Sequence, residues 1–207
     1  MALSLFRVLV IPAAVAFLVG AGEPPDKKDE KKKDKPDPQA TFEPRSKPGD
    51  GQKFLAKFVG DWEVAKTVHL STGEVVKMKG ECRQAMIHEG RFLKSDFTFE
   101  DDGAKITGTG LIGFEPQTGA FTSVWLDSRQ TRMSLRQSEG KFEGTEIVLF
   151  GKSLGGGAKG GGRSKTVTKL EEDGNRIVHR QFAVSPEGKE RMVMELVLKK
   201  KAATPGK

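Results

Sequence analysis

The residues best suited to chemistry in this chain are Asp127, Ser128 and Arg129, which directly follow Trp125 and Leu126. A serine beside a carboxylate could supply the nucleophile and base of a hydrolase, with Arg129 nearby at the rim of the site. Adjacent residues of a strand point to opposite faces, so Asp127 and Ser128 cannot share the hydrogen bond that such a pair needs. The sequence contains no G-x-S-x-G elbow either. We therefore predict no catalytic residue, and we interpret Asp127 as a rim residue whose carboxylate hydrogen-bonds to backbone N–H groups of a turn.

The histidines and the single cysteine do not have the spacing of metal ligands. His69, His88 and His179 lie far apart, and no H-x-H, H-x-x-x-H or Cys–His pair occurs. Zinc or haem ligands would have to converge from separate segments of the chain. Cys82 lies in an alternating run, which favours a small buried hydrophobe over a reactive thiol. We predict no metal, no cofactor and no internal disulfide.

Aromatic and methionine side chains form the most ligand-like pattern in the sequence. We expect one shared face of consecutive strands to carry Phe97, Phe99, Phe114, Phe121, Trp125, Met133, Met192 and Met194. Such residues can simply form the hydrophobic core. In a barrel of about ten strands they can instead line a cavity that holds a small molecule. The sequence leaves both interpretations open.

These side chains need elements that present alternate residues to one side. Apolar and polar residues alternate with a period of two near residues 76–83, 93–99, 106–114, 131–135 and 192–198. Turn sequences such as STGE, EDDG and PQTG separate the runs at short intervals. The pattern predicts an all-β fold, a single antiparallel up-and-down β-barrel of about ten strands, because closure removes the exposed edges of a sheet. Only Phe54, Leu55 and Phe58 indicate a short helical turn.

The N-terminus has the composition of an export signal. Arg7 precedes an apolar run at 8–19, and small residues follow, which predicts a signal peptide over 1–21 cleaved after Ala21. The run is shorter than the roughly 20 residues that cross a bilayer, and Pro12 interrupts it. A retained anchor is the alternative. We expect an exported protein, periplasmic or secreted, without stable membrane insertion after cleavage.

The remaining boundaries follow from charge and composition. Residues 22–52 are rich in Lys, Asp, Glu and Pro and should form a disordered charged tether. The β-barrel domain is expected at 53–200, and residues 201–207 should form a disordered basic tail. The formal net charge is +7, but the basic residues are scattered and are not interleaved with aromatic platforms, so we predict no nucleic-acid partner.

Several ordered motifs together resemble a known bacterial family. They are FVGDWE at 58–63, GRFL at 90–93, GTGLIGFEPQTGAF at 108–121, VWLDS at 124–128 and ERMVMELVLKK at 190–200. The series is similar to domain-of-unknown-function family 1579, whose members are uncharacterised exported proteins. The resemblance implies a lipocalin-like or calycin-like β-barrel, in which the tryptophan of the G-x-W motif packs across the barrel floor. It implies no established activity.

The chain departs from the family pattern in one respect. It has no Tyr, and Phe114 and Phe121 stand where such sequences usually place one. In related barrels a basic residue from a late strand covers the tryptophan. Here that residue could be Arg180, Arg191 or Lys199.

Three functions are consistent with these patterns. The first is a non-catalytic exported barrel that binds a small, mostly apolar ligand in its interior. The second is a structural or protein-interaction module with a filled core, and the third is an enzyme that uses rim residues. For the first, the candidate ligand-binding residues are Trp62, Phe97, Phe114, Phe121, Trp125, Asp127, Met133 and Met194.

Overall fold

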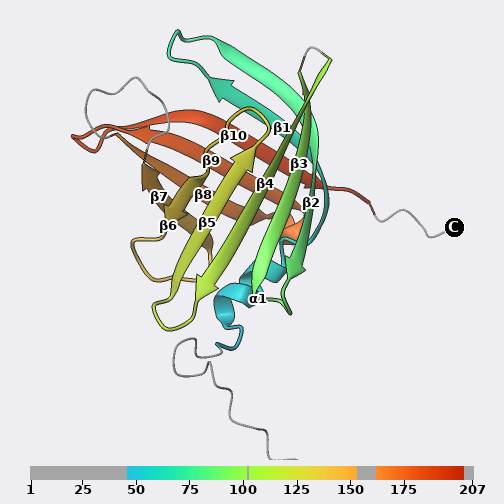
Figure 1. The fold of residues 1–207 in the computed structure, drawn as a ribbon, viewed down its shortest axis with the longest axis vertical. Coiled ribbons are helices and arrows are strands. Elements are labelled where there is room, and N and C mark those ends of the chain that lie inside the picture. The colour runs from blue at the N-terminus through green and yellow to red at the C-terminus, as the bar shows by residue number, and fades with distance from the viewer. Residues whose placement is uncertain (1–45, 102, 153–161, 203–207) are drawn as a thin grey trace, which may run out of the picture. The chain divides into compact units, whose positions relative to one another are not determined.

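The computed structural model describes residues 46–101, 103–152 and 162–202. The predicted signal peptide, most of the predicted tether and the last five residues lie outside these ranges. The described chain forms one short α-helix, a 3-10 turn and ten strands (Figure 1). The strands are β1 (Gly60–His69), β2 (Val75–Ile87), β3 (Phe92–Asp101), β4 (Ala104–Glu115), β5 (Ala120–Asp127), β6 (Ser134–Gln137), β7 (Glu146–Lys152), β8 (Arg163–Glu171), β9 (Arg176–Val184) and β10 (Glu190–Lys200).

Each strand pairs antiparallel with the strands before and after it in the chain, and β10 pairs with β1 to close a barrel. The predicted all-β, up-and-down barrel of about ten strands is therefore confirmed. The alternating pattern explains the fold, because inward residues such as Trp62 and Val64 are buried while Asp61 and Glu63, which alternate with them, are exposed. Among the described residues, no helix has the length and apolar composition needed to span a bilayer.

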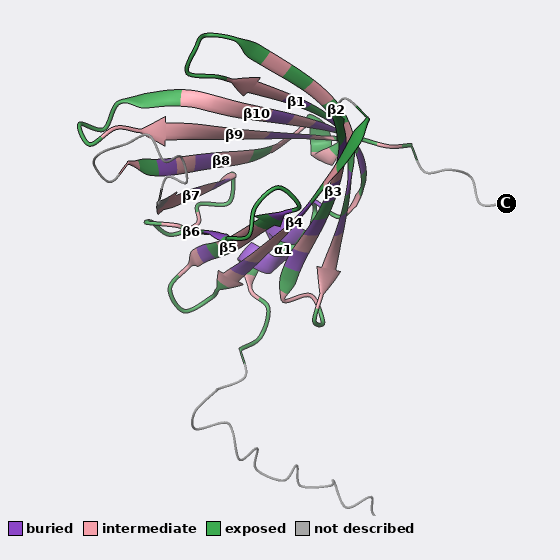
Figure 2. Cartoon of the chain, turned by 45° about the horizontal axis from the view of Figure 1, so that its top comes forward, coloured by how far each residue is buried: buried purple, intermediate pink, exposed green. Residues whose placement is uncertain are grey.

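The helix α1 (Asp50–Ala56) lies across one end of the barrel, and Figure 2 shows much of it buried. Gln52 ties it in place by accepting a hydrogen bond from Gly49 N at 2.7 Å and donating one to the Phe114 carbonyl at 2.7 Å. A Cβ atom at Gly51 would lie 2.2 Å from the ring of Phe114, so only glycine allows this close approach. Residues 50–52, which the composition assigns to the tether, thus belong to the folded domain. Asp50 is exposed, but Gly51 and Gln52 are buried by tertiary contacts that composition does not reveal.

Trp62 forms the floor of the barrel, as the G-x-W resemblance implies. Its indole is fully buried and donates to the Phe58 carbonyl at 3.1 Å. The basic residue over it is Lys200, whose Nζ lies 5.5 Å from the ring, and not Arg180, Arg191 or Lys199. The register explains the correction, because Lys200 pairs directly with Trp62 and directly opposed residues share a face. Lys199 faces the other way, and Arg180 pairs outside with Glu195 at 2.7 Å.

Aromatic rings fill the same end of the barrel beside α1. The ring of Phe121 lies 4.8 Å from that of Phe114 and 5.0 Å from that of Phe142, measured between centroids. Phe142 in turn lies 4.9 Å from Phe54 of the helix. This end is therefore packed, whereas the opposite half of the interior is not.

Candidate ligand-binding cavity

A cavity of about 330 Å³ occupies the barrel interior beyond the packed end. One side, which we call the aromatic wall, is formed by Phe97, Phe99, Trp125 and Met194. The rings of Phe97 and Trp125 meet edge to face with centroids 5.5 Å apart, and Phe97 stacks on Phe99 at 6.0 Å. These contacts hold the rings in fixed positions and leave apolar surface facing the empty volume.

The structure brings four of the eight predicted ligand-binding residues to this cavity: Phe97, Trp125, Asp127 and Met194. Three others, Trp62, Phe114 and Phe121, do not line it and belong to the core and the packed end. Met133 lies outside the barrel with 61% of its surface exposed, so its assignment to the inward face is wrong.

The error at Met133 comes from the inverted orientation of β6. The alternation predicts Met133 and Leu135 on the apolar inner face, but Leu135 is 69% exposed and Arg136 lines the cavity. The reason is the pairing of Ser134 with Trp125, which places both side chains on the inner side. A four-residue strand buries too little surface for its apolar pattern to fix the register, so the pairing with β5 decides it.

Asp127 organises the end of β5, at the end of the cavity opposite α1 (Figure 1). Its carboxylate accepts hydrogen bonds from Arg129 N at 2.9 Å, from the Arg129 guanidinium at 3.1 Å and from Trp125 Nε1 at 3.1 Å. The geometry matches the predicted bond from the carboxylate to a backbone N–H group. Burial would raise the pKa of Asp127, but the hydrogen bonds from Arg129 and Trp125 outweigh it and hold the pKa well below the usual value. A carboxylate so fully occupied orients Trp125 and is a poor general base.

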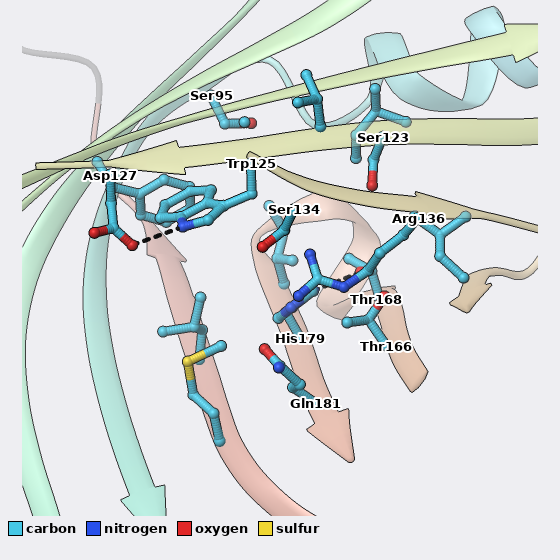
Figure 3. A pocket seen from close by; sticks show the side chains of 18 of the residues that line it. Ser95, Ser123, Trp125, Asp127, Ser134, Arg136, Thr166, Thr168, His179 and Gln181 are labelled. Atoms are coloured by element: carbon cyan, nitrogen blue, oxygen red, sulfur yellow. Dashed lines mark hydrogen bonds between the residues drawn. The ribbon is translucent and has the colours of Figure 1, made fainter. Parts of the chain in front are cut away.

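The second side of the cavity, which we call the polar wall, comes from β6, β8 and β9. It consists of Ser134, Arg136, Thr166, Thr168, His179 and Gln181. Figure 3 shows these side chains converging from three strands, with the guanidinium of Arg136 reaching toward His179.

His179 interacts with two neighbours on this wall, Thr168 and Arg136. Nδ1 of His179 lies 2.8 Å from the hydroxyl of Thr168. Burial, aided by the positive charge of Arg136, lowers the pKa of His179 to about 4, so the imidazole is neutral at physiological pH.

Arg136 carries a donor that no described residue satisfies. Its Nε atom is buried and makes no hydrogen bond, and burial lowers the pKa of its guanidinium. In the described part of the chain the only other buried side-chain polar atom without a partner is Oε1 of Gln84, and Gln84 also lines the cavity. Buried polar groups are nearly always hydrogen-bonded, so both orphaned atoms point to a site that something else completes.

Lys66 adds a further buried cation to the cavity. It is 8% exposed, and its Nζ lies 5.0 Å above the ring of Phe99. Burial lowers its pKa, as does the charge of Arg129, while Asp127 acts in the opposite direction.

The sequence contains a signal for some of these residues. Trp62, Val64 and Lys66 share one face of β1 by simple alternation, and His179 shares a face with the buried Ile177. A search for apolar residues alone on the inner face misses them. Arg136 is hidden by the inverted orientation of β6.

The metal-ligating side chains and the cysteine lie as follows in the described structure. Over residues 46–101, 103–152 and 162–202, no three His, Cys, Asp or Glu side chains are grouped to hold a metal ion. Cys82 is buried in the core, and burial raises the pKa of its thiol far above the ordinary value.

A closed antiparallel barrel with an aromatic and a polar wall around one interior cavity places this protein among the small cavity-bearing β-barrels. The chain belongs to the family described as "Protein of unknown function (DUF1579)", whose model matches residues 47–200. The family resemblance predicted from the motifs is thereby confirmed. Among curated proteins, no sequence matches the chain.

The fold is similar to the crystal structure of Rv2717c from M. tuberculosis. The TM-score is 0.52 and the sequences are 16% identical, with 75% of this chain and 100% of that chain covered. At this identity the likeness concerns the fold alone.

Proposed function

We propose that this protein is an exported, non-catalytic barrel that binds a small molecule in its interior cavity. The observation that carries the proposal is the cavity itself, about 330 Å³ in volume and lined on one side by fixed aromatic rings. Binding sites for small organic molecules begin at roughly 300 Å³ and combine apolar walls with a few polar groups, and this cavity has both.

The polar groups favour binding over a filled structural core. A core selected only for stability would pair Gln84 Oε1 and Arg136 Nε or replace them by apolar groups, since each unpaired buried polar atom costs about 1–3 kcal/mol. A ligand that offers hydrogen-bonding groups would recover that free energy on binding. The carboxylate of Asp127 already accepts hydrogen bonds from Trp125 and Arg129, so it is poorly placed to act as a base. This favours a binding protein over a hydrolase that uses rim residues.

A fluorescence titration with the neutral apolar probe N-phenyl-naphthylamine tests the proposal. The wild-type protein should enhance the probe's emission with saturable, one-site binding. Ser123→Phe places a ring into the cavity from β5 and should abolish the enhancement. The matched control is Thr122→Phe, which adds the same ring on the exposed face of the same strand and should leave binding intact. Equal binding by both variants, or none by the wild type, would contradict an interior site.

Export is a separate part of the proposal and needs its own measurement. The intact mass of the protein recovered from its native source should correspond to a chain that begins at Gly22, because the signal peptide is removed after Ala21. A mass that retains residues 1–21 would instead support the membrane-anchor alternative.

A further inference from the structure

The cavity carries an excess of positive charge. Its charged lining residues are Lys66, Arg129 and Arg136 against the single carboxylate of Asp127, and this leaves a net charge of 3 − 1 = +2. Asp127 forms an ion pair with Arg129 at the rim, and its charge also favours the charged form of Lys66. Arg136 has no ion pair among the residues that the structure describes, and it faces a partly enclosed volume, where water screens charge poorly.

We infer that the ligand is an amphipathic organic anion, whose carboxylate-type head pairs with Arg136 on the polar wall and whose apolar part lies along the aromatic wall. This inference rests on the proposed function and adds the chemical class of the ligand. A guanidinium is suited to this role because its planar set of N–H donors matches the two oxygens of a carboxylate.

The surroundings of Arg136 favour an anion over a cation or a neutral ligand. Thr166, Thr168 and Gln181 offer neutral hydrogen-bonding groups around the guanidinium, and no acidic residue is present on this wall. His179 is neutral because burial and the charge of Arg136 lower its pKa, so the cationic character of the wall resides in Arg136. A cationic ligand would meet Arg136 without a counter-charge and would be rejected.

Strand β7 holds Arg136 in this position. A Cβ atom at Gly151 would lie 2.5 Å from the Leu135 carbonyl oxygen and 2.9 Å from Cγ of Arg136, so glycine lets β7 press directly against β6. This close packing restricts the side chain at Cγ, and such restriction reduces the entropy lost on binding.

The apolar part of the ligand has a defined place opposite the polar wall. Phe97 and Trp125 present ring surface to the cavity, and Leu93 and Met194 extend it. A single straight-chain or aromatic group can therefore lie against the rings while its head contacts Arg136. The small volume favours a medium-sized tail over a long one.

Isothermal titration calorimetry with three ligands that share one tail tests the inference: decanoate, decanol and decylammonium. Wild-type protein should bind decanoate roughly tenfold to a hundredfold more tightly than decanol, as a charge-assisted hydrogen bond provides. Decylammonium should bind more weakly than decanol. Arg136→Met should remove the preference for decanoate and leave the affinity for decanol unchanged.

Controls separate the two proposals. Arg180→Met removes a cation from the outer surface of β9, where it pairs with Glu195, and should change no affinity. Equal binding of decanoate and decanol to the wild type would overturn the anionic head while leaving the cavity proposal intact. If neither the three ligands nor the neutral probe bound to the wild type, both the cavity proposal and the anionic head would be overturned.

The stability of the ligand-free variant provides a second readout. If Arg136 serves a ligand, replacing an unpaired buried cation by an apolar side chain should raise the midpoint of thermal unfolding by about 2–4 °C. Decanoate should then raise the midpoint of the wild type and not that of Arg136→Met. A lower midpoint for ligand-free Arg136→Met would mean that Arg136 has a structural role, and it would contradict the inference.

Discussion

His179 and Arg136 illustrate how burial changes the chemistry of single residues inside the barrel. Both face the same cavity, and neither has a carboxylate partner among the residues that line the polar wall. The histidine avoids the cost of a buried charge by remaining neutral, whereas arginine keeps its charge at every physiological pH. The guanidinium is therefore the group that the proposed ligand would contact.

His179 makes stability depend on pH in a defined window. Its pKa is about 4 in the folded protein, against 6.5 for an unperturbed histidine. As the pH falls from 6.5 toward 4, the unfolded chain takes up a proton that the folded protein excludes, so stability decreases. After allowance for water in the cavity, we expect the free energy of unfolding to fall by about 2 kcal/mol between neutral pH and about pH 4.5.

Urea unfolding at both pH values measures this loss in the wild type and in His179→Gln. The variant should lose about 2 kcal/mol less than the wild type over the same interval. Arg136→Met should show a smaller dependence than the wild type, because the charge of Arg136 contributes to the lowered pKa. An identical pH dependence in the wild type and His179→Gln would contradict the burial of a neutral imidazole.

At the scale of elements, β6 is where sequence and structure disagree. The alternation in 131–135 correctly indicates an extended segment but assigns its faces the wrong way round. The strand pairs with β7 through Gln137 and Phe150 alone, so its orientation depends on β5 and on the turn that Asp127 stabilises. Apolar side chains consequently face outward and a cation faces inward.

Two leucine-to-lysine substitutions test this orientation. Leu135→Lys lies on the exposed face of β6 and should change the free energy of unfolding by less than about 0.5 kcal/mol. Leu149→Lys lies on the buried inner face of the neighbouring β7 and should cost about 3 kcal/mol or more. Urea unfolding of both variants gives the comparison. Similar large losses for the two substitutions would mean that Leu135 faces inward after all.

The remaining elements are predictable for a physical reason. Long strands such as β3 and β10 alternate over most of their length, and the burial of one face then fixes which residues point inward. Phe97, Trp125 and Met194 are found in this way. Lys66 shares the inner face of β1 by alternation, but a search for apolar residues passes over it and over Gln84, and the inverted orientation of β6 hides Arg136. The contacts of Gln52 and Lys200 are likewise set by long-range register, which a single sequence does not contain.

At the scale of the whole molecule, the barrel is packed at one end and hollow at the other. Helix α1 and the rings of Phe114, Phe121 and Phe142 fill the first end, and the cavity with its two walls occupies the second. The closed sheet provides the stability, since it buries a continuous core and leaves no unpaired edge. The hollow end is therefore where partly buried cations such as Arg136 can be placed, and this is the basis of the proposed ligand site.

Native mass spectrometry of the protein recovered from its own source tests this division most directly. Wild-type protein should carry an added mass that is released on denaturation, and Ser123→Phe expressed in the same source should carry none. Thr122→Phe should retain it, since the change lies outside the barrel. Recovery of the bare polypeptide mass from the wild type, under conditions that preserve the fold, would contradict a tightly bound interior ligand.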